Sequence, residues 1–268
     1  MVAKPARAAE PSRLRTFGAT DRGRVREVNE DAFGMVELES GSRWQGGRVA
    51  TWSTLGAGVL LEVSDGMGGA KAGEVASALS VEGVLGGMLA AARRGPVDED
   101  TLRFVIEHVS ERIHSAGRRP DRRGMGATLT ALLVQGYEGF VAQIGDSRAY
   151  LLRDGAIGQI THDQSYVQML VDAGVMTADQ AERSPKKNII LQVMGQESVS
   201  VALGRIALRS GDRVLLCSDG LTNVVDDDAI RRVAETETDV ESAASALIER
   251  ALDGGAPDNV TVIVAEIE

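Results

Sequence analysis

Four aspartates occupy positions from which a side chain could take part in metal chemistry. Three apolar, strand-like segments each end in an aspartate with a glycine next to it, and a fourth segment begins shortly after an aspartate; these residues are Asp65, Asp146, Asp219 and Asp258. The end of a strand in a packed core holds a side chain rigidly, and a neighbouring glycine lets the backbone turn sharply. Such positions could gather several carboxylates around a cation.

Carboxylates gathered at low dielectric repel one another, so they are costly to bury unless they are protonated or neutralised by cations. The acidic pair Glu30–Asp31 could add to such a cluster. Because oxygen ligands without His or Cys select hard ions, the ions would be Mg²⁺ or Mn²⁺ rather than zinc. The residues alone leave two interpretations open, a shared metal site or a set of independent turns, since an Asp-Gly pair after a strand is commonly a turn.

Ten strands are expected to position these residues. Asp154–Gly155, between two short apolar runs, is typical of a tight hairpin turn. The tryptophan-containing segment 41–58 could be a long hairpin or a surface insertion. The strands are predicted by runs rich in Val, Ile, Leu and Thr at residues 14–20, 32–38, 59–64, 127–134, 139–144, 149–153, 156–161, 199–207, 213–217 and 260–267.

Helices are expected between the strands. Apolar residues at helical spacing predict helices over 71–94, around 102–113 and over 240–253. Thr177 followed by Gln180 resembles a capping box and predicts a further short helix. The three consecutive aspartates at 226–228 are interpreted as a solvated helix N-terminus, and His108 and His114 as solvated residues on the second helix.

The composition restricts the class of protein. The chain has 268 residues and a formal net charge of −10, which argues against a nucleic-acid binder because such a protein needs a basic face. No apolar run approaches the ~20 residues that span a bilayer, and the basic tail at residues 1–13 lacks the apolar core of a secretory signal. The single cysteine, Cys217, is interpreted as a buried structural residue, and it favours a reducing, cytoplasmic setting.

Six short motifs run through the chain from about Thr16 to Glu268: Arg26-Glu27-Val28-Asn29-Glu30-Asp31, Asp65-Gly66-Met67-Gly68-Gly69, Gly126-Ala127-Thr128-Leu129, Gly145-Asp146-Ser147-Arg148, Ser218-Asp219-Gly220-Leu221 and Asp258-Asn259-Val260-Thr261. With these motifs in this order, the chain resembles the metal-dependent protein serine/threonine phosphatases of type 2C, particularly the bacterial branch. Each motif is short, but the six together are specific.

The resemblance implies an α+β fold, a four-layer α-β-β-α sandwich of two mainly antiparallel sheets flanked by helices. It implies a single catalytic domain over residues 14–268, with a flap-like subdomain at about 162–196. The metals would lie at one end of the sandwich.

The same resemblance implies roles for individual residues. Asp65 would bridge two ions, and Asp219 and Asp258 would complete the first site. The carbonyl of Gly66 would serve the second ion together with Glu30, directly or through water.

Two further roles follow from the resemblance. Asp146 and Asp219 look like the pair that binds a weaker third ion in bacterial members. Arg26 would hold the phosphate, because its planar fork matches two phosphate oxygens. Arg26, Asp65 and Asp219 are therefore the expected catalytic residues.

The implied reaction is hydrolysis of phosphoserine and phosphothreonine monoesters by a water activated between two Mn²⁺ or Mg²⁺ ions. The substrates would be phosphorylated proteins, as targets of a partner Ser/Thr kinase. One alternative is a pseudophosphatase that binds phosphoproteins or a regulator without turnover, but such a protein is expected to lose a metal-site acid. A calcium-binding or P-loop protein is not supported, since neither a run of closely spaced acidic ligands nor a P-loop motif occurs.

Several positions depart from the family pattern. Met67 stands where many members carry a histidine proposed as general acid, and methionine cannot donate a proton. Gln164 and Ser184–Pro185 stand in the flap region where His and His-Pro are usual, which affects flap ordering and substrate preference. His162 lies at a strand end near the expected site and has no assigned role.

Overall fold

The computed structural model describes residues 13–44, 46–68 and 72–268. Within this part the apolar runs form antiparallel strands, whose bounds are β1 Arg13–Asp21, β2 Asp31–Glu37, β3 Ala50–Ser53, β4 Val59–Met67, β5 Gly126–Ala127, β6 Leu129–Gln135, β7 Glu138–Ile144, β8 Arg148–Arg153, β9 Ala156–Gln159, β10 Ala202–Ala207, β11 Arg213–Cys217 and β12 Val260–Ile267. Sheet A has the order β3-β1-β12-β11-β8-β9. Sheet B has the order β10-β7-β6-β4-β2, and the short β5 pairs with β4.

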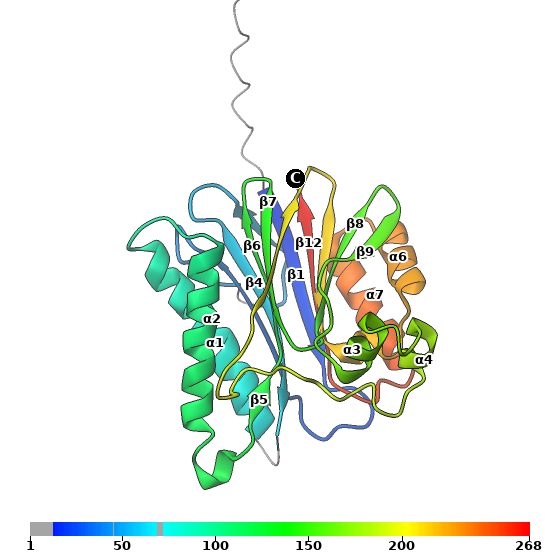
Figure 1. The fold of residues 1–268 in the computed structure, drawn as a ribbon. Coiled ribbons are helices and arrows are strands. Elements are labelled where there is room, and N and C mark those ends of the chain that lie inside the picture. Colours follow the sequence, from blue (N-terminus) through cyan, green and yellow to red (C-terminus); the bar gives the residue numbers. More distant parts are fainter. Residues whose placement is uncertain (1–12, 45, 69–71) are drawn as a thin grey trace, which may run out of the picture.

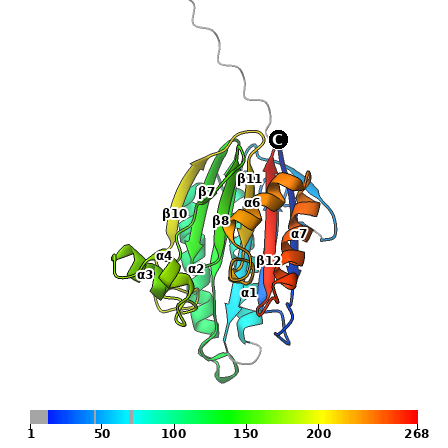
Figure 2. The same ribbon diagram turned by 90° about the vertical axis from the view of Figure 1, so that its right-hand side faces the viewer.

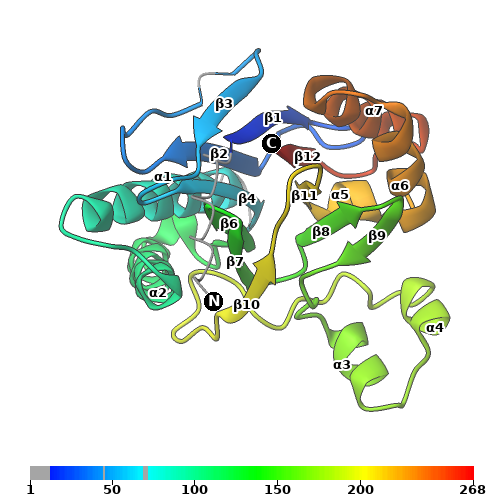
Figure 3. The same cartoon turned by 90° about the horizontal axis from the view of Figure 1, so that it is seen from above.

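The helices cover the outer faces of the two sheets. Their bounds are α1 Ala72–Ala92, α2 Glu99–Ala116, α3 Tyr166–Asp172, α4 Ala178–Glu182, α5 Asp219–Thr222, α6 Asp227–Thr236 and α7 Val240–Asp253, with a 3₁₀ turn η1 at Pro120–Arg122. Figure 1 shows α1 and α2 against sheet B, and Figure 2 shows α6 and α7 beside β8, β11 and β12 of sheet A. The expected four-layer sandwich is confirmed, and Figure 3 shows α3 and α4 standing outside the layers.

The strands that carry the candidate residues are anchored in a core between the sheets. Leu61 on β4 and Leu216 on β11 are fully buried in this core, as is Ile263 on β12. Asp65 and Asp219 follow within four residues of these anchors. Their backbone positions are therefore fixed by packing before any ligand binds.

Most of the predicted elements are confirmed, with shifts at their ends. The hairpin at Asp154–Gly155 is present, since both residues have positive φ as its tight turn requires. The predicted strand at 127–134 divides into β5 and β6 because Thr128 turns towards Asp65: Thr128 N–H donates to the Asp65 carbonyl (2.8 Å), and Asp65 N–H donates to Thr128 Oγ1 (2.9 Å). The predictions for residues 1–12, Gly69 and Lys71 lie outside the described residues.

The segment 41–58, left open by the sequence, adds an edge strand to sheet A. Its strand β3 pairs with β1, and not with the neighbouring β2. Trp52 is buried, and its indole N–H donates to Thr16 Oγ1 at 2.7 Å. The segment is therefore part of the sandwich.

Helix α1 corrects the expectation that no apolar run approaches membrane-spanning length. Residues Ala72–Ala92 are long and apolar enough by length and composition to cross a bilayer. The helix nevertheless packs between sheet B and α2, with side chains such as Val84 and Met88 fully buried there. A single core helix of this kind is weak evidence for a membrane span.

The predictions for three single side chains had different outcomes. Cys217 is fully buried in β11, as expected, and burial raises the pKa of its thiol to about 12. His108 is exposed, but His114 is not a freely solvated residue, since its Nδ1 lies 3.0 Å from the carbonyl oxygen of Gly195. This contact joins α2 to the segment that returns from α4.

Candidate metal centre

The register of β2 and β4 places two aspartates side by side. Asp31, the first residue of β2, pairs directly with Asp65 on β4. Residues paired in this way lie about 5 Å apart across the strands. The sequence indicated Asp31 only as part of the acidic pair Glu30–Asp31 and predicted no role for it.

Sheet A delivers two more aspartates from adjacent strand ends. Asp219 is the first residue of α5 and stands two residues after the end of β11, and Asp258 stands two residues before β12. A Cβ on Gly220 would lie 1.9 Å from the carbonyl oxygen of Asn259, so this position requires glycine for the close approach of α5 and β12. The glycine beside Asp219 therefore brings the two strand ends together.

Asp31 links the two sheets at this point. Its Oδ2 accepts hydrogen bonds from Ser218 Oγ and from Thr261 Oγ1, both at 2.7 Å. Asn259 fixes the preceding segment, because its Oδ1 accepts from the N–H of Glu30 at 2.8 Å. Sequence reasoning assigned no role to these supporting residues, and their motif positions next to Asp219 and Asp258 are the only signal for them.

The electrostatics identify one cluster of carboxylates. Burial raises the pKa of Asp65 well above its usual range, and the charges of Asp31, Asp219, Asp258 and Asp146 raise it further, in that order. Each of these side chains is therefore close enough to Asp65 to disfavour its ionisation.

Neighbouring members of the cluster are affected in the same way. Burial raises the pKa of Asp31 to about 7, and burial together with the charge of Asp219 raises that of Asp146 to about 7. The pKa of Asp219 is raised by burial and by the charge of Asp258, while the hydrogen bond that it accepts from Asn223 acts in the opposite direction. The fold thus concentrates negative charge that protons or cations must neutralise.

Unpartnered oxygen atoms show that the donor set fits hard cations. Among the described residues, four carboxylate oxygens of this cluster are buried without a hydrogen-bond partner: Glu30 Oε1, Asp31 Oδ1, Asp146 Oδ1 and Asp219 Oδ1. Buried polar atoms are nearly always hydrogen-bonded. A group of acceptor-only oxygens without donors is the arrangement that Mg²⁺ or Mn²⁺ would complete.

The carbonyl of Gly66 shares a cradle with Glu30 beside the first turn of α1. A Cβ on Gly73 would lie 2.4 Å from Glu30 Oε1 and 2.8 Å from the carbonyl oxygen of Gly66. The two predicted ligands of the second ion therefore converge on the space left by the missing side chain of Gly73. Ser77 on the same helix holds the segment, because its hydroxyl donates to the Glu30 carbonyl at 2.5 Å.

Both carboxylate oxygens of Asp258 accept hydrogen bonds from other residues. Its Oδ2 accepts from Arg26 Nη2 at 2.7 Å, and its Oδ1 accepts from the N–H of Asn259 at 2.8 Å. In the described part of the chain, no group of three or more His, Cys, Asp or Glu side chains is arranged to hold a metal ion. A cation would have to compete with Arg26 for Asp258, and a carbonyl and waters would supply its remaining ligands.

The turn that carries Asp146 is attached to the flap-like segment. The N–H of Gly145 donates to Gln164 Oε1 (2.9 Å), and the N–H of Gln164 donates to the Gly145 carbonyl (2.9 Å). Arg148 holds Asp163 through two nitrogens, at 3.0 and 2.7 Å. Gln164, which departs from the family pattern, therefore ties the start of the flap-like segment to the turn that carries Asp146.

Two ionisable residues of the flap-like segment form electrostatic contacts with carboxylates. The charge of Lys187 lowers the pKa of Asp219, which places this lysine near the carboxylate cluster. His162 forms an exposed pair with Asp172 (2.8 Å). Sequence reasoning missed Lys187, because nothing in its immediate neighbourhood distinguishes it from a solvated lysine.

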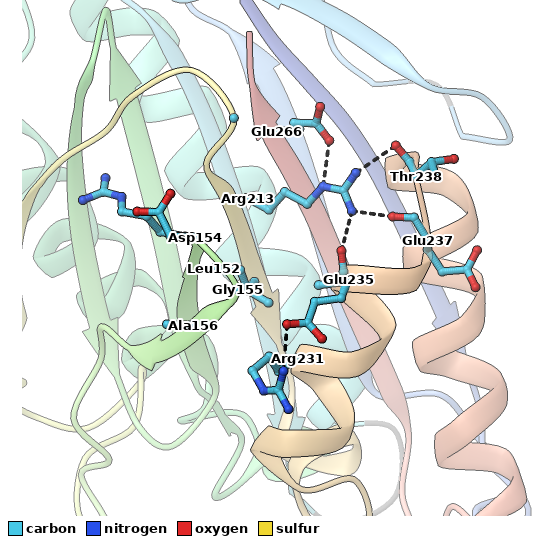
Figure 4. A pocket seen from close by; sticks show the side chains of 13 residues that line it. Leu152, Asp154, Gly155, Ala156, Arg213, Arg231, Glu235, Glu237, Thr238 and Glu266 are labelled. Atoms are coloured by element: carbon cyan, nitrogen blue, oxygen red, sulfur yellow. Dashed lines mark hydrogen bonds and ion pairs between the residues drawn. The ribbon is translucent and has the colours of Figure 1, made fainter.

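A separate cavity lies at the other end of sheet A. It has a volume of about 460 Å³ and is lined by the β8–β9 hairpin, α6 and the end of β12. Figure 4 shows Arg213 in this cavity, where it donates to Glu266 and to the carbonyls of Glu237 and Thr238. Because Glu266 is about 25 Å along the strand from Asp258, the cavity is separate from the carboxylate cluster.

Comparison with known proteins identifies the family. Residues 27–253 match the family described as protein phosphatase 2C. The serine/threonine protein phosphatase PstP of Mycobacterium tuberculosis is 39% identical over 261 residues, which cover 95% of this chain and 45% of PstP. The serine/threonine phosphatase stp of Listeria monocytogenes is 33% identical over 251 residues, 92% of this chain and 93% of that protein. The chain belongs to the protein phosphatase 2C family, as the six motifs predicted.

A solved structure agrees in fold. The catalytic domain of PstP, in complex with two manganese ions, matches with a TM-score of 0.74 and 37% identity, covering 96% of this chain and 99% of that one. The chain spans about half the length of PstP.

Proposed function

We propose that this chain is a metal-dependent protein serine/threonine phosphatase that hydrolyses phosphoserine and phosphothreonine monoesters. The observation that supports this most strongly is the buried carboxylate cluster, in which four oxygen atoms have no hydrogen-bond partner among the described residues. The cluster lies beside an arginine at the protein surface, so a place for cations and a place for a phosphate adjoin each other.

The residues divide into two cation sites and a third pair. Asp65, Asp219 and Asp258 are proposed for the first cation, and Glu30 with the Gly66 carbonyl for the second. Asp146 is proposed to share a weaker third ion with Asp219. Bound Mn²⁺ or Mg²⁺ would supply a water of lowered pKa as the nucleophile.

The surrounding side chains orient the substrate. Arg26 is half-exposed and ion-paired to Asp258, and its carboxylate neighbours keep the pKa of its guanidinium raised, so it stays positively charged. Its fork can hold two phosphate oxygens and oppose the charge that spreads over them in the transition state. Met67, 36% exposed beside Gly66, has no proton to give. The leaving alkoxide is therefore expected to take its proton from water.

The setting of this reaction is also a proposal. The relatives are phosphatases named for serine and threonine, so phosphorylated proteins, as targets of a partner Ser/Thr kinase, are the proposed substrates. Residues 162–196 are proposed to act as a flap within a single catalytic domain over 14–268. A cytoplasmic location stays a prediction from the single cysteine.

A pseudophosphatase is the second candidate, and the ion pair between Arg26 and Asp258 is the observation that favours it. In this pair Asp258, a predicted metal ligand, and Arg26, the predicted phosphate ligand, are bound to each other. A protein in which the pair persisted would bind neither cation nor phosphate productively.

Hydrolysis of a phosphothreonine peptide by the purified protein tests the proposal. Phosphate release is expected with Mn²⁺ or Mg²⁺, but not with EDTA, and it should vanish in Asp65→Asn, which controls for contaminating phosphatases. Absence of release at every metal concentration from a folded protein would favour the pseudophosphatase.

Replacing Arg26 by alanine is expected to lower kcat/KM for the peptide by about 10- to 100-fold, in line with the loss of hydrogen bonds to a charged group. Arg26→Lys should be intermediate, because lysine keeps the charge but lacks the fork. The Mn²⁺ concentration for half-maximal activity should not rise, since Arg26 competes with the cation for Asp258. Arg24→Ala, an exposed neighbour in the same loop, is the control. An unchanged kcat/KM in Arg26→Ala would remove Arg26 from the site.

A further inference from the structure

Four arginines are concentrated in the loop that follows α2. Residues 118–123 contain Arg118, Arg119, Arg122 and Arg123 with a single acidic residue, in a chain that has 39 acidic and 29 basic side chains. Arg119 and Arg122 share that acidic residue, Asp121, at 3.4 and 3.8 Å. Neither Arg118 nor Arg123 forms an ion pair with any residue of the described ranges. This group is called the arginine loop.

The arginine loop is held on a fixed frame. Backbone bonds fold it back onto the end of α2: Arg119 N–H donates to the Ala116 carbonyl, and Arg122 N–H donates to that of Arg119. Met125 N–H then donates to the Arg122 carbonyl, and the Met125 side chain is buried in the core. The backbone that carries the arginine side chains is therefore held in a defined conformation.

The arginine loop lies at the same end of the sandwich as the proposed active site. Gly126, three residues after Arg123, pairs with Met67 across β4 and β5, and Met67 is two residues from Asp65. Three residues span at most about 11 Å and paired strands lie about 5 Å apart, so an extended peptide of about seven residues covers the path from Asp65 to Arg123. Figure 1 shows this loop at the lower end of the molecule with β5, the end at which β12 begins.

We propose that the arginine loop is a docking surface for acidic or additionally phosphorylated residues flanking the phosphosite of a protein substrate. The inference rests on the proposed phosphatase function and specifies its substrate class. A strongly acidic chain repels acidic segments over most of its surface. Unpaired guanidinium groups near the site offer the bidentate, charge-assisted contacts that carboxylates and phosphates accept. Acidic flanks should therefore be bound within about seven residues of the phosphosite.

The test compares two phosphothreonine peptides that differ only in their flanks, glutamates in one and glutamines in the other. We expect kcat/KM to favour the glutamate peptide by about three- to tenfold at low salt, as for two exposed charge pairs, and the preference to shrink at 0.5 M salt. Arg118→Gln/Arg123→Gln should lose most of this preference. Arg232→Gln/Arg250→Gln, which removes two exposed arginines elsewhere, should keep it. The rate on para-nitrophenyl phosphate should be the same in all three proteins.

A binding measurement separates failure of this inference from failure of the proposed function. The affinities of the two labelled peptides for the Asp65→Asn protein, with and without the arginine-loop substitutions, do not depend on turnover. The same glutamate preference in binding, lost with Arg118 and Arg123, would support the docking surface even if no hydrolysis occurred. Equal binding of both peptides would overturn the docking surface. It would also be overturned if the arginine-loop substitutions left peptide binding unchanged and weakened only the binding of the protein to vesicles of anionic lipid.

Discussion

Asp219→Asn is expected to reduce metal-dependent phosphate release by at least about a thousandfold, which corresponds to about 4 kcal/mol of lost transition-state stabilisation. The substitution keeps the volume of the side chain and removes its charge. Asp219 contributes an unpartnered oxygen to the cluster, while its other oxygen accepts from Asn223 Nδ2 at 2.9 Å. An amide in this place binds a hard cation more weakly. Initial rates over a range of Mn²⁺ concentrations measure the effect.

The same substitution should leave the metal-free protein at least as stable as the parent. Burial and the charge of Asp258 raise the pKa of Asp219, so its ionised form destabilises the folded state. Thermal unfolding in EDTA checks this, with Asp253→Asn, an exposed aspartate, as the matched control for both measurements. Near-normal rates at saturating Mn²⁺ would exclude Asp219 from the ligand set.

The sequence could locate the strand ends because their signal is local. The apolar runs before Asp65 and Asp219 become strands whose buried side chains fix the following residue, and the neighbouring glycines lie where the backbone must turn or approach closely. The hairpin at Asp154–Gly155 and the capping box at Thr177 depend on short-range geometry in the same way.

Features that depend on pairing between distant segments could not be predicted. Asp31 becomes a neighbour of Asp65 only through the register of β2 and β4, and one residue of slip would turn it to the opposite face. Gly73 was not recognised, because the space beside it matters only once α1 lies against Glu30. The hydrogen bond from Arg26 to Asp258 likewise joins two residues that are 232 positions apart in the sequence.

The arrangement of the cluster makes stability depend on pH and metal together. We expect the melting temperature of the metal-free protein to fall as pH rises from about 5 to 8. In this window the folded protein binds more protons than the unfolded chain, because the pKa values of Asp31 and Asp146 are raised to about 7. The free energy of unfolding therefore decreases with pH, and the loss is complete above the folded pKa values.

Mn²⁺ should reverse this loss, since a cation takes the place of the protons. At about 100 times its dissociation constant a ligand adds about 3 kcal/mol, which is about 5–10 °C for a chain of this size. The difference in melting temperature between Mn²⁺ and EDTA should widen from pH 5.5 to pH 8. In Asp219→Asn most of this difference should disappear, whereas Asp253→Asn should retain it.

One part of the pH dependence should remain in Mn²⁺, because it arises at Glu62, outside the cluster. Glu62 on β4 is fully buried under α1, where its Oε1 accepts from Ser80 Oγ at 2.8 Å and its Oε2 has no described partner. Burial raises its pKa to about 8. At pH 7 Glu62 is therefore ionised in the unfolded chain but still mostly protonated in the folded protein. This difference lowers the free energy of unfolding by about 3 kcal/mol relative to its value at low pH. Glu62→Gln cannot ionise and should flatten the slope that remains in Mn²⁺ between pH 5.5 and 8. A slope that Mn²⁺ abolishes in the parent, or that Glu62→Gln leaves unchanged, would contradict this separation. Because the two sites share no hydrogen-bond partner among the described residues, the effects of Glu62→Gln and Asp219→Asn should add.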